Sequence, residues 1–198
     1  MIEKLLEWDQ KLLLWLNGFY YPALDPVVYL ISQTWFWIPL YLVLLWFVIK
    51  QYKKESWIVL AGILFTIIFT DQFTSSFMKP FFGRLRPSHQ PELEGLLHLV
   101  RNLSGEVYTG GMYGFASAHA ANTFGIATFF ALMFRPAKRW VFTLYAWAFL
   151  MTYTRIYMGV HYPGDILVGA VFGLLGGWMG FRFCRWALAR RKAASASD

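Results

Sequence analysis

Hydrophobic residues run along this chain in five long stretches that are separated by short polar segments. Each stretch has roughly the 20 residues that an α-helix needs to cross the hydrocarbon core of a bilayer. The pattern therefore predicts an all-α fold, an integral membrane bundle of five transmembrane helices. The stretches lie at about 27–49, 57–78, 115–134, 140–158 and 166–184.

The N-terminal segment 1–17 has a different pattern, in which apolar residues recur at roughly helical spacing but charged residues interrupt them. Leu5, Leu12 and Leu16 belong to the apolar set, and Glu3 and Asp9 are among the interruptions. Such a segment is too polar to span a membrane. It predicts an amphipathic helix that lies on the membrane surface.

Polar residues, glycines and prolines fill the segment 79–114, which predicts a long loop outside the membrane. Loops of this length are usually functional or disordered. We treat residues 1–190 as a single membrane-embedded domain. The last residues, 191–198, end in alanines and serines, and we expect a short disordered tail there.

The composition fits a membrane protein, with 58% hydrophobic, 20% aromatic and only 15% charged residues. A soluble domain has about 25% charged residues. A net charge of +7 would suggest nucleic acid as the partner of a soluble chain. Here the basic residues flank apolar stretches, so we expect no nucleic-acid partner. The single cysteine, Cys184, excludes an internal disulfide and a cysteine metal cluster.

The distribution of lysine and arginine predicts the orientation in the membrane. The turns after the first and third stretches and the C-terminal segment together hold 11 of these residues, against 7 on the other side. Because positive residues are retained in the cytoplasm, the long loop and the N-terminal helix are expected to face outward.

Three polar clusters fall at the outer ends of the apolar stretches. One ends the second stretch, one begins the third, and one joins the fourth to the fifth. Helix packing can therefore bring three segments that are distant in sequence into one pocket. The candidate site residues are Lys79, Arg86, Ser117, Ala118, His119, Arg155, His161 and Asp165.

These residue types favour phosphoryl transfer. A phosphate ester carries up to two negative charges, and Lys79, Arg86 and Arg155 supply three cations for its oxygens. Ser117 and Ala118 open a helix, where backbone N–H groups and the helix dipole favour an anion. The sequence has no aspartate-rich metal cage, so we expect neither a metal nor another cofactor.

Two histidines divide the remaining chemistry. Neutral imidazole attacks phosphorus and forms a covalent phosphohistidine, the role we expect for His161. Asp165 follows four residues later, and one helical turn would place its carboxylate beside the ring to fix the tautomer. His119 would protonate the leaving oxygen and then activate water.

The three clusters resemble the signature of the type-2 phosphatidic acid phosphatase family. That family shares its active site with bacterial acid phosphatases and vanadium haloperoxidases. Its pattern is Lys-x6-Arg-Pro, then Pro-Ser-Gly-His, then Ser-Arg-x5-His-x3-Asp. This chain departs from it at Ala116, Ala118 and Thr154, which replace proline, glycine and serine.

The resemblance implies a bundle of membrane helices in a bacterial cytoplasmic membrane, multi-pass, with the active site on the periplasmic or extracellular face. It implies that the phosphate-binding residues are Lys79, Arg86, Ser117, Ala118 and Arg155. The catalytic residues that it implies are His161 as nucleophile, His119 as general acid and Asp165 as the orienting carboxylate.

We therefore predict a lipid phosphatase whose partners are a lipid phosphate substrate and membrane lipids. Undecaprenyl pyrophosphate, lipid A, phosphatidic acid and phosphatidylglycerol phosphate all fit. The small size favours undecaprenyl pyrophosphate, followed closely by lipid A. Two alternatives stay open: a lipid-to-lipid phosphotransferase, and a non-catalytic lipid-binding or transport protein. A haloperoxidase would bind vanadate in the same pocket, but membrane helices favour a lipid substrate.

Several polar residues have no role in this scheme. We expect a structural hydrogen-bonding or charge-pairing role for Asp71. For His89 and His98 we expect solvated side chains, with substrate contact as the open alternative. Two roles stay open for Arg84, a structural one and contact with phosphate or a lipid headgroup. Glycines in the fifth stretch predict close helix contact within or between chains, so a homo-oligomer is open. They are Gly173, Gly176, Gly177 and Gly180.

Overall fold

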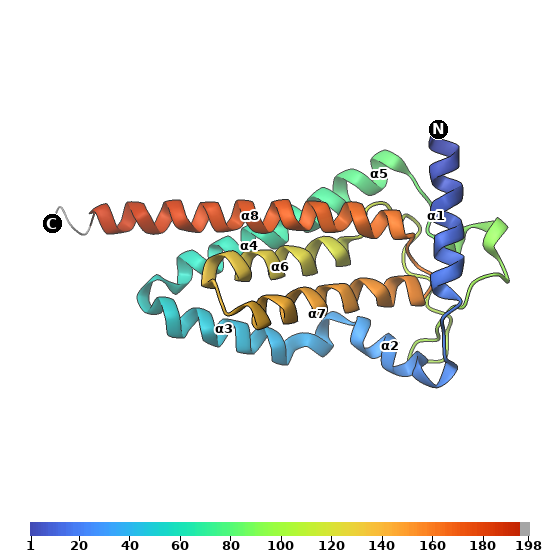
Figure 1. The fold of residues 1–198 in the computed structure, drawn as a ribbon, viewed down its shortest axis with the longest axis horizontal. Coiled ribbons are helices and arrows are strands. Elements are labelled where there is room, and N and C mark those ends of the chain that lie inside the picture. The colour runs from blue at the N-terminus through green and yellow to red at the C-terminus, as the bar shows by residue number, and fades with distance from the viewer. Residues whose placement is uncertain (195–198) are drawn as a thin grey trace.

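The computed structural model describes residues 1–194, and its helices form an elongated bundle with loops gathered at one end (Figure 1). No strand occurs within these residues, which confirms the all-α prediction. The α-helices are α1 (Ile2–Asn17), α2 (Asp25–Ser32), α3 (Ile38–Tyr52), α4 (Ser56–Gln72), α5 (Lys79–Phe82), α6 (Ala118–Phe134), α7 (Lys138–Tyr157) and α8 (Pro163–Ala194). Short 3-10 turns occupy Pro22–Leu24, Thr34–Trp37, Lys53–Glu55, Pro87–His89 and Pro91–Leu93, and a π-helix, η4, occupies Phe73–Met78.

The first predicted stretch is broken in the structure, so the prediction of one helix over 27–49 is wrong. The backbone at Gln33 is extended, with φ −83° and ψ 135°, and separates α2 from α3. The indole N–H of Trp37 donates to the carbonyl of Ile31 across this break, at 2.7 Å. Pro39 lies in the first turn of α3, where its missing N–H leaves no bond unmade.

The other four stretches correspond to α4 continued by η4, to α6, to α7 and to α8. By length and composition, two helical segments pass as membrane spans, Thr34–Phe82 and Pro163–Ala194, each with mean hydropathy 1.6. The first of these contains the α3–α4 hairpin. The number of crossings stays a prediction. Helix α8 runs into the predicted tail as far as Ala194, and the rest of that tail, 195–198, lies outside the described residues.

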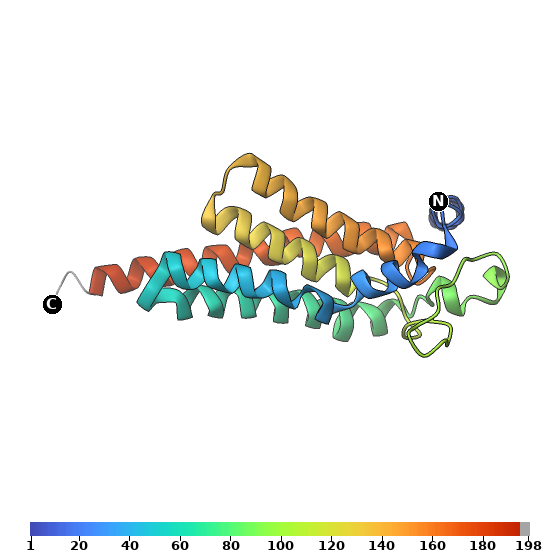
Figure 2. The same cartoon turned by 90° about the horizontal axis from the view of Figure 1, so that it is seen from below.

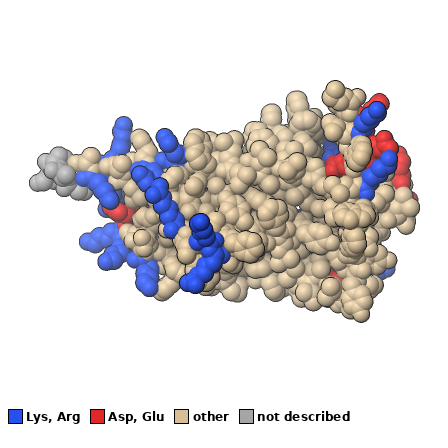
Figure 3. Space-filling model, viewed as in Figure 1, with Lys and Arg blue, Asp and Glu red and all other residues tan. Residues whose placement is uncertain are grey.

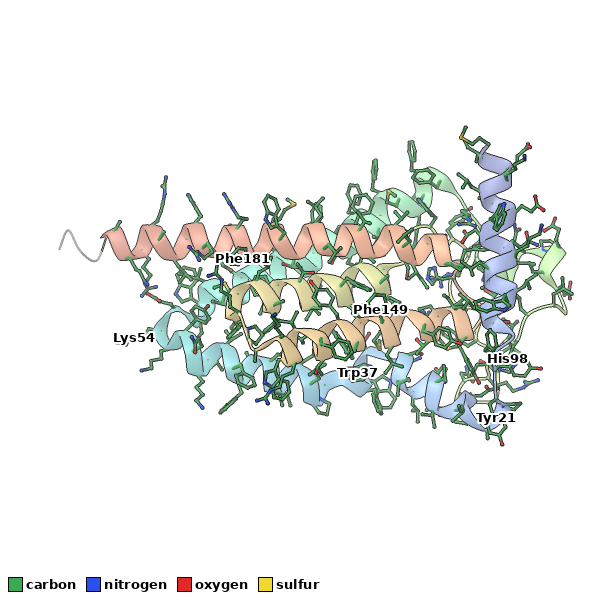
Figure 4. All side chains as sticks on the ribbon, viewed as in Figure 1. Tyr21, Trp37, Lys54, His98, Phe149 and Phe181 are labelled. Atoms are coloured by element: carbon green, nitrogen blue, oxygen red, sulfur yellow. The ribbon has the colours of Figure 1, made fainter. Side chains whose placement is uncertain are left out.

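Charged side chains mark the two ends of the bundle, and the surface between them is almost free of charge in the view of Figure 3. Lysines and arginines gather at the end that carries the α3–α4 turn and the last turns of α8. Acidic side chains gather mainly at the other end, near α1. Figure 4 shows Lys54 and His98 at these opposite ends. This separation is the one expected for a bundle that spans a bilayer.

Helix α6 lies at the centre and packs against α4, α7 and α8. Its backbone touches α8 through glycine. A Cβ atom placed on Gly173 would lie 2.5 Å from the carbonyl oxygen of Ala121, and one on Gly177 would lie 2.5 Å from that of Gly125. A Cβ atom on Gly176 would lie 2.7 Å from the side-chain Cγ2 of Thr70 in α4. The predicted close contact therefore forms within the chain, and it sets the distance between α6 and α8.

Helix α1 lies across the end of the bundle and is seen end-on in Figure 2. Trp8 and Trp15 are 73% and 62% exposed, as expected for a helix that lies on a lipid surface. The buried amide of Asn17 donates to the carbonyls of Ile156 and Tyr157, at 3.0 Å and 2.8 Å. These bonds fix the end of α1 to the end of α7.

Replacing Gly177 by leucine should destabilise the bundle by about 1–3 kcal/mol, because the new side chain must displace the α6 backbone. Thermal unfolding in detergent, followed by circular dichroism, measures the effect. Leu174→Ala on the same helix is the control, since Leu174 is 41% exposed. An unchanged melting temperature for Gly177→Leu would show that α6 and α8 are not packed this closely.

Candidate active site

The three predicted clusters meet at the end of the bundle that carries α1. Arg86 Nη1 lies 3.0 Å from His161 Nε2. The charges of Arg86, Arg155 and Lys79 all act on His161. The same three cations and His161 act on His119 across the pocket. Residues from α5, α6, α7 and the loops between them therefore surround one space.

His161 lies in the turn between α7 and α8 and is 1% exposed. Its Nδ1 is 3.2 Å from Asp165 Oδ2, an oxygen that also accepts the backbone N–H of Tyr162 at 3.1 Å. Its Nε2 faces Arg86, and a guanidinium only donates. These partners assign the proton to Nδ1 and the lone pair to Nε2. Nε2 is thus the nitrogen that is able to attack an electrophile.

Burial lowers the pKa of His161 well below its ordinary value of 6.5, and the charges of Arg86 and Arg155 lower it further. The ring is therefore neutral at neutral pH, the form that a nucleophile requires. Burial and Arg155 also lower the pKa of Arg86, to about 10. Arg86 still carries its charge at neutral pH, so the cationic field around His161 persists.

Arg155 is 1% exposed, and only part of its guanidinium is satisfied. Its Nη2 donates to the hydroxyl of Tyr108 at 3.1 Å. Its Nε and Nη1 are buried and have no hydrogen-bond partner among residues 1–194. A buried polar group left unpaired is unfavourable by about 1–3 kcal/mol, and more when it is charged. These unpaired N–H donors are therefore available to the oxygens of an anion such as phosphate.

Lys79 begins α5 directly after the π-helix η4. A π-turn adds one residue to each turn and so rotates the side chains beyond it about the helix axis, and such turns are frequent at functional sites. The ammonium of Lys79 donates to the hydroxyl of Ser75 at 3.2 Å. It makes no ion pair within the described part of the chain.

The start of α6 supplies the remaining predicted residues. Ser117 caps the helix, with its hydroxyl oxygen accepting the N–H of Ala120 at 3.4 Å. Its own N–H donates to the backbone carbonyl of Asp165 at 3.0 Å, which ties α6 to α8. Ala118 and His119 follow in the first turn, where backbone N–H groups lack intrahelical acceptors. The first turn of α6 thus offers N–H donors and an imidazole together.

A cavity of about 430 Å³ extends from His119 into the bundle, between α3, α4 and α6. Its walls are mostly apolar and include Leu44 and Ile63. Asp71 also lines it, at the polar end with His119 and Asn122. A hydrocarbon chain fits such a space when a polar group lies at its mouth.

The structure adds Tyr108, which the sequence did not single out for the site, and gives Arg84 defined partners there. Tyr108, on the long loop, bonds to Arg155, and Arg84 bonds to the carboxylates of Asp9 and Asp165, at 2.8 Å each. Neither contact leaves a signal in the sequence, because each joins segments far apart in the chain. Within residues 1–194 no group of three or more His, Cys, Asp or Glu side chains is arranged to hold a metal ion.

The prediction of solvated His89 and His98 is wrong. His98 Nε2 is 2.9 Å from Asp25 Oδ1, and its ring stacks on Tyr20 with 3.9 Å between ring centres. The Nε2 atom of His89 is buried with no partner in the described part of the chain. Neither ring is therefore fully solvated.

Comparison with known proteins finds similar chains that are named as lipid phosphatases. A lipid A 4′-phosphatase of Bacteroides thetaiotaomicron is 41% identical over 193 residues, which cover 96% of this chain and 83% of the relative. A lipid A 4′-phosphatase of Porphyromonas gingivalis is 37% identical over 195 residues, covering 98% and 80%. The crystal structure of Aquifex aeolicus LpxE has a TM-score of 0.60 at 25% identity, covering 87% of this chain and 94% of that one.

The model of the PAP2 superfamily matches residues 57–189, a range that contains all three motif clusters. This match confirms the resemblance to the type-2 phosphatidic acid phosphatases. The chain belongs to the PAP2 superfamily.

Proposed function

We propose that this chain is a bacterial membrane lipid phosphatase that removes the 4′-phosphate from lipid A through a phosphohistidine on His161. The observation that carries the proposal is the pair of unpaired Arg155 nitrogens among the buried cations around His161. The two relatives at 41% and 37% identity supply the substrate class. They favour lipid A over undecaprenyl pyrophosphate, which the sequence placed first.

In the first step His161 Nε2 attacks phosphorus, and the bond from phosphorus to the lipid oxygen breaks. Lys79, Arg86 and Arg155 bind the phosphoryl oxygens and stabilise the charge that develops on them. The bound phosphate offsets the cations that act on His119, so His119 carries a proton in the complex and donates it to the leaving oxygen. Asp165 holds the Nδ1–H of His161 and stabilises the positive charge that the ring gains.

In the second step His119, now neutral, takes a proton from water as the water attacks the phosphohistidine. The bond between phosphorus and nitrogen breaks, inorganic phosphate leaves, and His161 returns to its neutral form. No metal takes part in either step of this scheme. The apolar cavity beside His119 holds an acyl chain of the substrate while the phosphate lies on the cations.

We infer that the active site faces the periplasm, on the outer side of the inner membrane. Lysines and arginines gather at one end of the bundle, which is the end expected in the cytoplasm (Figure 3). The site lies at the other end, beside α1. Substrate then enters sideways from the outer leaflet of this membrane.

Purified enzyme in detergent should release phosphate faster from lipid A carrying a 4′-phosphate than from 1-phosphorylated lipid A, undecaprenyl pyrophosphate or phosphatidic acid. His161→Ala should lower this rate by at least about 1,000-fold, and His119→Ala by about 100-fold or more. Malachite-green detection of inorganic phosphate measures the rate. A faster rate on another lipid would contradict the substrate assignment, and phosphate transferred to a second lipid would indicate a phosphotransferase.

His161 should be neutral in the free enzyme from about pH 8 to about pH 6, because burial and then Arg86 lower its pKa below 6.5. Protonation then removes the nucleophile only below this range. The ¹⁵N spectrum of histidine-labelled protein measures this, since the chain has only 4 histidines. His161→Gln assigns the signal, and Arg86→Ala should raise the midpoint. A His161 titration centred at 6.5 or above would contradict the proposed electrostatics.

Chelation should not affect turnover. After incubation with EDTA the rate should stay within about two-fold of the untreated enzyme, because side chains rather than a metal stabilise the phosphoryl oxygens. The assay is the same phosphate release, with and without added magnesium. Loss of activity in EDTA that magnesium restores would show that the metal-free mechanism is wrong.

A further inference from the structure

Arg84 lies between the site and the surface helix α1, and the mechanism above gives it no role. Its Nη1 donates to Asp165 Oδ1 and its Nη2 to Asp9 Oδ2, at 2.8 Å each. Its guanidinium carbon lies 3.8 Å from the centre of the Tyr162 ring. The planar group is therefore held on two edges and on one face. Because both nitrogens bond carboxylates, Arg84 does not point its charge at the phosphate.

Arg84 is the hydrogen-bond partner of one of the two carboxylate oxygens of Asp165. The side chain of Asp165 is 0% exposed, so bulk water does not solvate it. Its Oδ2 bonds to His161 and to the N–H of Tyr162, and its Oδ1 bonds to Arg84. A buried carboxylate is stable in its charged form only when it is paired and hydrogen-bonded. Without Arg84, Oδ1 would lose its partner, and the carboxyl group would protonate or rotate away from His161.

Asp9 fixes Arg84 from α1. Its Oδ2 accepts from Arg84, and its Oδ1 accepts the backbone N–H of Gly164 at 2.7 Å. Gly164 is the second residue of α8, where a carboxylate also complements the helix dipole. A Cβ atom at Gly164 would lie 2.7 Å from Asp9 Oδ2, so a larger residue would push α1 away.

We propose that Arg84 and Asp9 are positioning residues for the His161–Asp165 pair, which makes the surface helix α1 part of the catalytic apparatus. The inference rests on the proposed phosphatase function. Asp9 holds Arg84, Arg84 holds the carboxylate of Asp165, and the carboxylate holds the Nδ1–H of His161. The chain of contacts reaches from a helix on the membrane surface to the nucleophile.

The test is steady-state kinetics of phosphate release from 4′-phosphorylated lipid A. Arg84→Ala should lower kcat by about 10–100-fold and Asp9→Asn by about 3–10-fold, with KM within about 3-fold of wild type. Arg84→Lys should recover only part of the loss, because an ammonium cannot bridge two carboxylates as a planar fork does. Glu7→Gln, on the exposed side of the same helix, is the matched control and should leave kcat unchanged.

The ¹⁵N signal of His161 Nδ1 provides a readout that does not need activity. In Arg84→Ala it should show a mixture of tautomers where the wild type shows Nδ1–H alone. A folded Arg84→Ala enzyme with normal kcat, or with its loss confined to KM, would overturn the inference. If Arg84→Ala does not fold, Arg84→Lys and Asp9→Asn decide in its place. If the wild type releases phosphate from no lipid, the proposed function fails, and the His161 signal still tests the positioning.

Discussion

The site depends on a group of cations, two of them buried and one partly buried, that surround a neutral imidazole. Arg86, Arg155 and Lys79 lie close enough that each acts electrostatically on His161, and like charges repel strongly away from water. Two nitrogens of Arg155 have no partner among residues 1–194. The rest of the fold must therefore supply the stability that this cluster lacks. An oxyanion in the pocket would relieve both the repulsion and the missing hydrogen bonds, which is the basis of the proposed phosphate binding.

Close backbone contact between helices supplies part of this stability. Gly173 and Gly177 let α8 approach α6, so that the starts of these two helices lie side by side. There the N–H of Ser117 donates to the carbonyl of Asp165, at 3.0 Å. The start of α6 carries His119, and the turn before α8 carries His161. The relative position of the two imidazoles thus follows from how α6 and α8 pack. A bilayer further restricts the axes of these helices to one direction.

Local spacing was enough to predict part of this site. Two spacings can be read directly from the sequence, the one from Lys79 to Arg86 and the four-residue step from His161 to Asp165. The structure brings His161 and Asp165 into contact. Contacts across the fold were not predictable, because Asp9 and Arg84 are 75 residues apart and Tyr108 lies in an irregular loop. The break at Gln33 was also missed, because apolar residues continue on both sides of it.

The most direct test of the central claim is the structure of the enzyme crystallised with orthovanadate, an anion that mimics phosphate during transfer. We predict vanadium bonded to His161 Nε2, with vanadate oxygens accepting from Nε and Nη1 of Arg155, the two nitrogens now unpaired. Vanadate bound elsewhere, or bound in the pocket with no bond to His161 and with Arg155 still unpaired, would contradict the claim.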